Sequence, residues 1–196
     1  IVLMGNPNVG KSVVFSRLTG ANVIASNYPG TTVDFSKGKM CLGKVGHEII
    51  DAPGTYSLEP SNRAEEVALE MFNQADLVIN VVDATNLERN LYLTTQLIDM
   101  NIKVVIALNM YDELEKRDVD FDHSSLGKMI GIPIIPTVAS KGKGIDELFE
   151  KIIDVYEDRD PVVRHIHINY GSNIEKSISA IQSLIKGNKT ITDRYS

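Results

Sequence analysis

The chain of 196 residues is short of cysteine, of long apolar runs and of positive charge. Its single cysteine, Cys41, cannot form an intrachain disulfide, which fits a reducing compartment. No run approaches about 20 consecutive apolar residues, so no segment is expected to cross a bilayer. The formal net charge of −6 argues against a nucleic-acid-binding surface, which normally carries a basic excess. The remaining composition, 43% hydrophobic and 23% charged, is typical of a globular protein.

Apolar segments rich in β-branched residues alternate with segments of helical periodicity. This alternation predicts an α/β fold with a mostly parallel six-stranded sheet and helices on both faces. The runs 77–82, 104–108 and 132–135 are nearly unbroken apolar, as strands buried on both faces should be. The expected strands are 1–4, 35–41, 47–51, 77–83, 104–109 and 132–137, and the expected helices are 11–19, 63–73, 87–101, 124–130 and 145–156.

The sequence changes character after residue 156, where a charged segment ends in Pro161. An amphipathic helix is then predicted over 173–186, because four isoleucines recur there at helical spacing: Ile174, Ile178, Ile181 and Ile185. One such helix cannot form a core by itself. We therefore predict a first domain over 1–158, followed by a linker and a partial helical domain over 159–196.

A phosphate-binding motif, G-x-x-x-x-G-K-[ST], lies between the first predicted strand and the first predicted helix. Its glycines let backbone amides curl around phosphate oxygens, and the helix N-terminus adds the positive end of its dipole. Lys11 is expected to reach the β- and γ-phosphates, and Ser12 to ligate Mg²⁺. The predicted nucleotide-binding loop consists of Gly5, Asn6, Pro7, Asn8, Val9, Gly10, Lys11 and Ser12.

Two further segments are predicted to meet the phosphates and the metal. Asp51 and Gly54 fit D-x-x-G at the end of a strand, where the carboxylate can hold Mg²⁺ through water and the glycine amide can sense the γ-phosphate. D-x-x-G alone is a common turn, and its place in the order of motifs favours the nucleotide interpretation. The loop over 27–33 contains Gly30, Thr31 and Thr32, and either threonine could serve Mg²⁺ when the loop orders around a triphosphate.

The motif N-x-x-D follows the apolar strand 104–108. The Asp112 carboxylate can accept from guanine N1–H and the exocyclic amine, an arrangement that adenine does not present. The Asn109 amide can bond N7 and tie neighbouring loops together. Buried polar sites of this kind discriminate by about 10⁴–10⁵ in favourable cases. Met110 stands where lysine is usual, and its flexible thioether is expected to cover the base.

The tripeptide Ala139, Ser140 and Lys141 follows the last predicted strand. Its Ser140 amide is expected to meet guanine O6, while the Lys141 stem covers the second face of the base. The tripeptide is weak by itself and gains support from its register with the other motifs. Together the motifs predict a P-loop NTPase of the Ras-like, TRAFAC type that binds GTP or GDP with Mg²⁺.

The exact amino-acid sequence of these motifs resembles that of the cytosolic GTPase domain of the ferrous-iron transport protein B family. The likeness covers residues 1–157 closely, and the tail is similar to the start of that family's helical domain, which is reported to slow nucleotide release. Five segments carry this resemblance, and residues 80–93 are the most distinctive of them. The segments are GNPN (5–8), NYPG (27–30), DAPGTYSL (51–58), NVVDATNLERNLYL (80–93) and NMYD (109–112).

The resemblance implies a GTP-binding and GTP-hydrolysing fragment that regulates Fe²⁺ uptake. The fragment itself would be soluble and would lie at the cytoplasmic face of the cell membrane, where its partner is a polytopic membrane domain absent from this sequence. No nucleic-acid partner is expected, and a homo-oligomer stays an open alternative.

The resemblance also implies individual roles. The family's Gly-x-Thr-Val pattern selects Thr32 over Thr31 as the Mg²⁺ ligand. Asn8 matches the asparagine that coordinates K⁺ beside the phosphates in potassium-activated GTPases, where the cation replaces an arginine finger worth roughly 10³–10⁵ in rate. A loop-capping hydrogen bond is the other interpretation of Asn8, and Asn27 belongs with less support to the same cation site. Lys11, Thr32 and Asn8, through K⁺, are the expected catalytic residues.

Thr55 stands after Gly54, where Ras-like GTPases keep a glutamine that orients water. Without that amide, intrinsic hydrolysis is expected at about 10⁻³ s⁻¹ or less in the absence of K⁺ or a partner. Arg63 and Arg89 could act in trans, although exposed helix charges are the simpler interpretation. Two other functions stay open: a ribosome- or tRNA-associated GTPase, and a nucleotide sensor with negligible hydrolysis.

Two weaker patterns have a metal-binding interpretation. His165 and His167 alternate without a further ligand, and the alternating aspartates before residue 124 are more typical of a solvated loop: Asp118, Asp120 and Asp122. Both sets are interpreted as polar surface residues.

Overall fold

The computed structural model describes residues 1–20, 23–42, 45–164 and 171–186, so His165 and His167 lie outside the described residues. The chain forms two compact units, Ile1–Ile166 and His167–Ser196, which are treated separately. Residues 159–164 are joined to the first unit: the Asp160 carboxylate accepts from Lys151 Nζ at 2.7 Å, and the Arg164 amide donates to the Gly131 carbonyl at 3.3 Å. The division at residue 158 stays a prediction.

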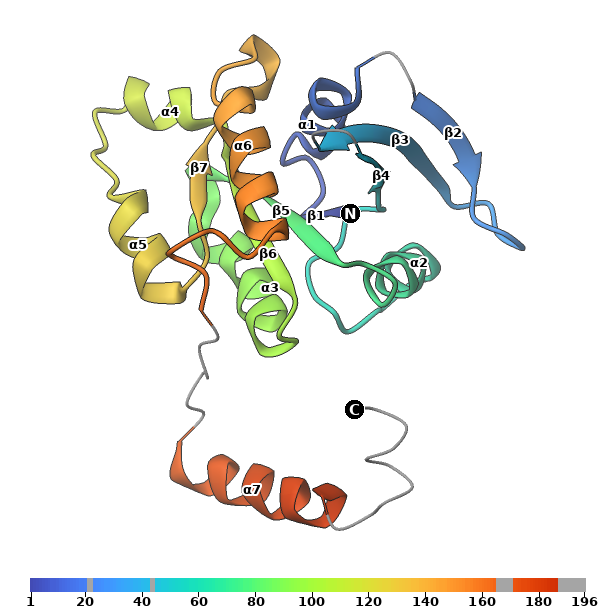
Figure 1. Cartoon of the computed structure of the whole chain (residues 1–196), viewed down its shortest axis with the longest axis vertical. Coiled ribbons are helices and arrows are strands. Elements are labelled where there is room, and N and C mark those ends of the chain that lie inside the picture. Colours follow the sequence, from blue (N-terminus) through green and yellow to red (C-terminus); the bar gives the residue numbers. More distant parts are fainter. Residues whose placement is uncertain (21–22, 43–44, 165–170, 187–196) are drawn as a thin grey trace. The chain divides into compact units, whose positions relative to one another are not determined.

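The first unit is built on a mostly parallel sheet with strand order β2-β3-β4-β1-β5-β6-β7 (Figure 1). Strands β4, β1, β5, β6 and β7 run parallel, whereas β2 and β3 pair antiparallel with each other and β3 with β4. The strands are β1 (Val2–Met4), β2 (Val23–Asn27), β3 (Asp34–Leu42), β4 (Val45–Asp51), β5 (Leu77–Asp83), β6 (Lys103–Asn109) and β7 (Ile134–Pro136).

Within the described residues the sheet has seven strands, so the expected count of six is wrong by one. The additional strand is β2, which lies at the edge of the sheet and exposes four of its five residues. Such a strand has neither a continuous apolar run nor a clean alternation of apolar and polar residues. Its pairing with β3, rather than its own pattern, defines it.

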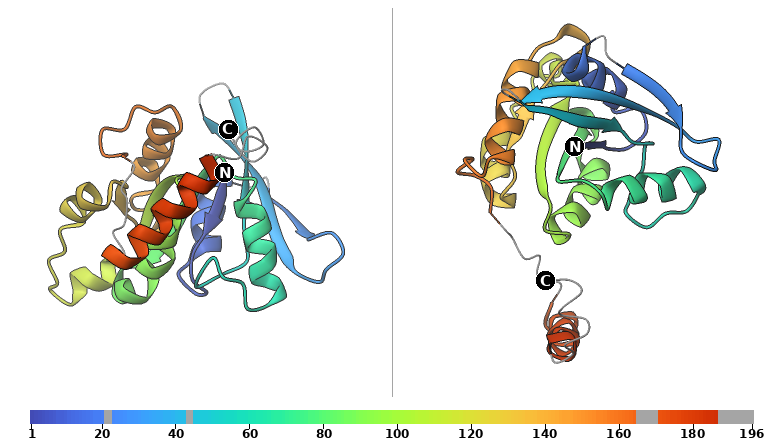
Figure 2. Two further views of the ribbon diagram at one scale, coloured as in Figure 1. Left: turned by 90° about the horizontal axis from the view of Figure 1, so that it is seen from below. Right: turned by 45° about the vertical axis from the view of Figure 1, so that its right-hand side comes forward.

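The helices cover both faces of the sheet, as the sequence predicts (Figure 2). Successive residues of β1 point to opposite faces, so Val2 and Met4 join one apolar cluster while Leu3 joins the other. Helices α2 and α3 contribute to the first cluster, and α1 and α6 to the second. The helices are α1 (Lys11–Thr19), α2 (Arg63–Phe72), α3 (Leu87–Asp99), α4 (Tyr111–Lys116), α5 (His123–Ile130) and α6 (Ile145–Tyr156), with 3-10 turns η1 (Ala84–Asn86) and η2 (Ala139–Lys141).

Local sequence explains where α2 begins. The Asn62 side chain accepts from the Glu65 amide at 3.0 Å, and the Glu65 carboxylate accepts in return from the Ser61 amide at 2.8 Å. The bond to Asn62 satisfies an amide that has no partner inside the helix, and the bond from Ser61 ties the preceding residue to the first turn. The α2 helix therefore starts at the residue after Asn62.

The second unit contains helix α7 (Ser172–Lys186), which agrees with the amphipathic helix predicted over 173–186. Several of its apolar side chains are exposed, Leu184 most of all. Within the described parts of both units, no helix has the length and apolar character needed to cross a membrane.

The topology brings the sequence motifs to one edge of the sheet. Because β1, β4, β5, β6 and β7 run parallel, the segments that follow their carboxyl ends meet there. The G-x-x-x-x-G-K-S loop follows β1, D-x-x-G follows β4, N-x-x-D follows β6, and η2 follows β7.

Candidate functional site

The loop after β1 curls tightly against the rest of the sheet edge. A Cβ on Gly5 would lie 2.4 Å from the Val81 carbonyl oxygen, and a Cβ on Gly10 would lie 2.4 Å from Asn109 Nδ2. Gly10 (φ 84°) and Asn8 (φ 68°) both adopt the left-handed region, which glycine and asparagine tolerate best. The residues of the predicted loop therefore suit the path of the backbone.

A cavity of about 360 Å³ opens in front of this loop, at the start of α1. Helix α1 has no side-chain cap and no acidic residue in its first turn, so its N-terminal amides are available to an anion. The cavity is lined by Asn6, Pro7, Asn8, Gly10, Lys11, Ser12, Val13 and Gly54.

Lys11 and Asp51 form an ion pair at this cavity, with side chains 11% and 8% exposed. An ammonium group, the Ser12 hydroxyl and a carboxylate thus come from two motifs that are 40 positions apart. Oxygen ligands of this kind suit Mg²⁺, and the ammonium suits phosphate oxygens. The donor set therefore fits a magnesium–phosphate group.

Gly54 lies against the phosphate-binding loop, because a Cβ on it would come within 3.1 Å of Pro7 Cα. The next residue, Thr55, is 1% exposed, and its hydroxyl donates to the Ser57 carbonyl at 2.6 Å. Its amide donates to the Gly5 carbonyl at 3.0 Å. Thr55 is therefore used to hold the loop after β4, and its hydroxyl is already engaged.

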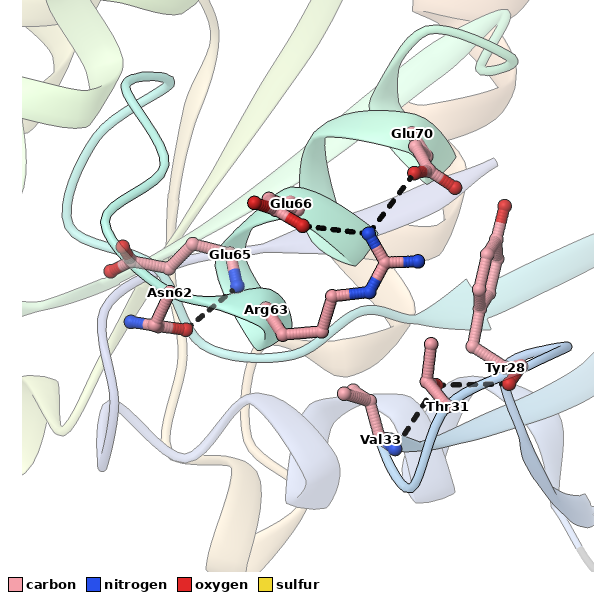
Figure 3. Close-up of polar contacts among 8 residues, drawn as sticks. All are labelled: Tyr28, Thr31, Val33, Asn62, Arg63, Glu65, Glu66 and Glu70. Carbon is pink, nitrogen blue, oxygen red and sulfur yellow. Dashed lines mark hydrogen bonds and ion pairs between the residues drawn. The ribbon is translucent and has the colours of Figure 1, made fainter.

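The loop between β2 and β3 is folded into a turn (Figure 3). The Thr31 hydroxyl donates to the Tyr28 carbonyl at 2.9 Å and accepts from the Val33 amide at 3.2 Å, whereas Thr32 is exposed. Gly30, Thr31 and Thr32 line a hollow of their own with Arg63, separate from the cavity at Lys11. The structure therefore does not bring Thr32 to Ser12 and Asp51.

The Arg63 guanidinium points along its own helix toward Glu66 and Glu70 (Figure 3). It lies 2.6 Å from the Glu66 carboxylate and 3.8 Å from that of Glu70. A hydrogen bond to Glu70 raises the pKa of the Tyr28 hydroxyl. Arg89 lies on α3, 4.3 Å from the ring centre of Tyr56. Both arginines considered for a role in trans thus make local contacts on the surface.

A second cavity of about 410 Å³ adjoins the first and shares Gly10 and Val13 with it. Asn109 lines the second cavity and is 4% exposed. Its Nδ2 donates to the Val9 carbonyl at 2.9 Å, and its Oδ1 accepts from the Ala139 amide at 3.0 Å. Asn109 thus ties the phosphate-binding loop to η2, a role that the sequence predicts for it. The second cavity is lined by Gly10, Val13, Asn109, Met110, Asp112, Glu113, Val138 and Ser140.

Asp112, which lines this cavity, forms an ion pair of 2.6 Å with Lys141. The hydrogen bond from the Lys141 ammonium lowers the pKa of the Asp112 carboxyl, so this carboxylate is ionised at neutral pH. Met110 adopts a left-handed backbone conformation beside it, with φ 58°. The Asp112 carboxylate, the Asn109 amide and Met110 therefore line the same cavity.

One residue that contacts η2 is not predicted from the sequence. Arg17, on α1, donates from Nε to the Ala139 carbonyl at 3.0 Å and from Nη2 to the Ser140 carbonyl at 2.8 Å. It belongs to no motif, and nothing in the helical pattern distinguishes it from a solvated surface arginine. Only the packing of α1 against η2 reveals its partners.

No group of three or more histidine, cysteine, aspartate or glutamate side chains in the described ranges could hold a metal ion. This includes the alternating aspartates before α5. Asp122 has a structural use instead, because its carboxylate accepts from the Ser125 amide at 2.9 Å and caps α5.

The family model of Ferrous iron transport protein B matches residues 1–152. The chain belongs to this family. It is 48% identical over 189 residues to the Fe(2+) transport protein A/Fe(2+) transporter FeoB fusion protein of Porphyromonas gingivalis, covering 94% of this chain and 22% of that protein. It is 39% identical over 195 residues to the Fe(2+) transporter FeoB of Staphylococcus aureus, covering 98% of this chain and 28% of that protein.

Solved FeoB structures share the fold. The cytosolic domain of T. maritima FeoB in a GDP form superposes with a TM-score of 0.88 at 34% identity, covering 96% of this chain and 75% of that one. A GDP-bound mutant of the S. thermophilus FeoB G-domain superposes with a TM-score of 0.84 at 39% identity, covering 94% of this chain and 70% of that one. The α/β P-loop GTPase fold is thereby confirmed. The chain spans 22% to 28% of the length of the two full transporters.

Proposed function

We propose that the chain is the GTP-binding and GTP-hydrolysing regulatory domain of a membrane ferrous-iron transporter. The observation that carries this proposal is the pair of adjoining cavities joined by Asn109: one offers amides and Lys11 to phosphates, and the other offers Asp112 to a base. A nucleoside diphosphate needs these two environments side by side. The GDP-bound structures of FeoB relatives support the choice of guanine nucleotide.

Phosphate binding falls to the loop before α1. Lys11 and the α1 amides neutralise the phosphate charge, and the glycines allow close approach of the backbone. Ser12 would hold Mg²⁺ directly, Asp51 would hold it through water, and Thr32 would complete the site once its loop moves. The engagement of the Thr31 hydroxyl in a turn supports Thr32. The other residues proposed around the phosphates are Gly5, Asn6, Pro7, Val9, Gly10, Gly30, Thr31 and Gly54.

Base recognition falls to the second cavity. Asp112 would accept from guanine N1–H and the exocyclic amine, and the Ser140 amide would donate to O6. Met110 and the Lys141 stem would cover the two faces of the ring. Guanine must then replace Lys141 as the hydrogen-bond partner of Asp112, while Ala139 and Asn109 keep the turn in register.

The proposed reaction is attack of water on the γ-phosphorus with cleavage of its bond to the bridging oxygen, which gives GDP and inorganic phosphate. Lys11 stabilises charge that develops on the leaving oxygens. Mg²⁺ and K⁺, when bound, would neutralise further charge, with Asn8 holding K⁺. Because the Thr55 hydroxyl is engaged and buried, no side chain there orients the water, so intrinsic hydrolysis is proposed to be slow.

The transporter context rests on the relatives. Both full relatives are named as Fe²⁺ transporters, and this chain would act as their nucleotide-dependent regulatory part at the cytoplasmic face of the membrane. Its partner would be the membrane domain of the same protein. Nucleotide state would change the loop containing Thr32, which is the kind of element that couples hydrolysis to a partner.

Calorimetry with magnesium-GDP and magnesium-ADP tests the core of the proposal. GDP should bind with micromolar or better affinity, and ADP at least about 100-fold more weakly, because Asp112 meets no donor pair on adenine. Equal affinities, or no binding of either nucleotide, would refute it.

A nucleotide sensor with negligible hydrolysis is the second candidate, and the engaged Thr55 hydroxyl favours it. Single-turnover hydrolysis of GTP in KCl and in NaCl separates the two. A rate in KCl at least about tenfold above that in NaCl supports the potassium-stimulated enzyme. Equal and negligible rates in both salts would establish the sensor instead.

A further inference from the structure

Arg17 holds the turn η2 from the side of helix α1. Its guanidinium spans two successive carbonyls, with Nε 3.0 Å from the Ala139 oxygen and Nη2 2.8 Å from the Ser140 oxygen. These carbonyls are 122 and 123 positions away in sequence. A planar guanidinium with fixed N–H directions constrains both groups together, which a lysine ammonium cannot do.

The Ala139 carbonyl and the Ser140 amide belong to one peptide unit. No peptide bond in the described residues is cis, so this unit is trans and planar, and its C=O and N–H point in opposite directions. A contact that fixes the carbonyl of Ala139 therefore fixes the direction of the Ser140 N–H. Ser140 itself lines the second cavity.

The charge of Arg17 has a second effect on the same peptide. A hydrogen bond from a cation polarises the carbonyl, and the polarised peptide becomes a better donor at its amide. On the preceding peptide, the Ala139 amide donates to Asn109 Oδ1 at 3.0 Å. The peptide between Ala139 and Ser140 is thus held by Arg17 on its carbonyl and by Asn109 through its neighbour.

We propose that Arg17 is a positioning residue for guanine recognition, which orients and polarises the peptide that presents the Ser140 N–H to guanine O6. This inference rests on the proposed function, because it assigns the base to the second cavity. Helix α1 then has two roles: it carries Lys11 at its start, and about 1.7 helical turns later Arg17 holds η2 in place.

The test compares Arg17→Gln and Arg17→Lys with wild type and with Arg159→Gln as a matched control. Arg159 is an exposed arginine that also makes two side-chain contacts, to Asp154 at 3.2 Å and Glu157 at 2.9 Å. The probes are magnesium-GDP and magnesium-6-thio-GDP, measured by calorimetry. The thio analogue keeps the ring edge read by Asp112 but offers sulfur, a weak acceptor, in place of O6.

Arg17→Gln should weaken GDP binding about tenfold and 6-thio-GDP binding less than about threefold. Arg17→Lys should lose about threefold for GDP, and Arg159→Gln should match wild type for both probes. The release rate of a fluorescent GDP analogue should rise in parallel with the loss of affinity.

Equal weakening of both probes would overturn the inference, because a merely structural arginine does not distinguish O6 from sulfur. Unchanged GDP affinity in Arg17→Gln would also overturn it. If Arg17→Gln fails to fold, Arg17→Lys decides by the same comparison. Failure of wild type to bind GDP would refute the proposed function itself, and this outcome is distinct from a loss of discrimination in the variants alone.

Discussion

The Asn109 side chain allows the sharpest prediction, because it is buried and joins three segments. Its Nδ2 donates to the Val9 carbonyl at 2.9 Å, and its Oδ1 accepts from the Ala139 amide at 3.0 Å and from the Thr137 hydroxyl at 3.4 Å. In Asn109→Ala, the Val9 carbonyl and the Ala139 amide lose their partner at a site where Asn109 is only 4% exposed, while the Thr137 hydroxyl loses only a long contact and can rotate.

Each buried polar group left without a partner costs about 1–3 kcal/mol. With two such groups and partial access of water to the vacated space, the free energy of unfolding should fall by about 2–4 kcal/mol. For a urea m-value of about 2 kcal/mol/M, the unfolding midpoint should fall by about 1–2 M.

Urea unfolding without nucleotide measures this loss, and magnesium-GDP affinity measures the effect on the site. We expect Asn109→Ala to bind GDP at least about 30-fold more weakly, because the phosphate-binding loop and η2 lose the side chain that ties them together. Asn73→Ala, an exposed asparagine at the end of α2, is the control and should change stability by less than about 0.5 kcal/mol. A midpoint for Asn109→Ala within about 0.2 M of wild type, which is the scatter of such fits, would refute the reasoning.

Three further changes test other parts of the molecule. Asp112→Asn should weaken GDP binding by about 100-fold and improve binding of xanthosine diphosphate, since an amide can donate to the xanthine oxygen. An unchanged GDP affinity in calorimetry would place the base elsewhere. Gly10→Ala should abolish tight GDP binding and lower the free energy of unfolding by about 1–3 kcal/mol, because the added Cβ would lie 2.4 Å from Asn109 Nδ2 on a backbone with φ 84°. A thermal unfolding midpoint equal to that of wild type would contradict this close approach of Gly10 to Asn109. Asp160→Asn should lower the free energy of unfolding in urea by about 1–3 kcal/mol, because its fully buried carboxylate pairs with Lys151 at 2.7 Å. GDP affinity should not change, and an unchanged free energy of unfolding would mean that the pair contributes nothing to stability.

Helix and strand positions follow from the sequence wherever a pattern is long or has clear end signals. The bounds expected for α1, α6 and β5 agree with the structure, because glycines precede both helices and an unbroken apolar run forms the strand. Helix α4 was not expected, since its six residues are too few to show a helical period. Strand β2 was missed for a different reason, because its exposed side chains carry no burial pattern.

The class of fold, the order of the motifs and the residue types at the candidate nucleotide site can be read from the sequence, because they depend on local periodicity and fixed spacings. Which side chains come into contact depends on tertiary packing. Asn109 contacts Val9 across 100 positions, and Arg17 contacts Ala139 across 122. Such pairs form when separate helices and strands pack at one sheet edge, and no local pattern encodes which side chains then come within hydrogen-bonding distance.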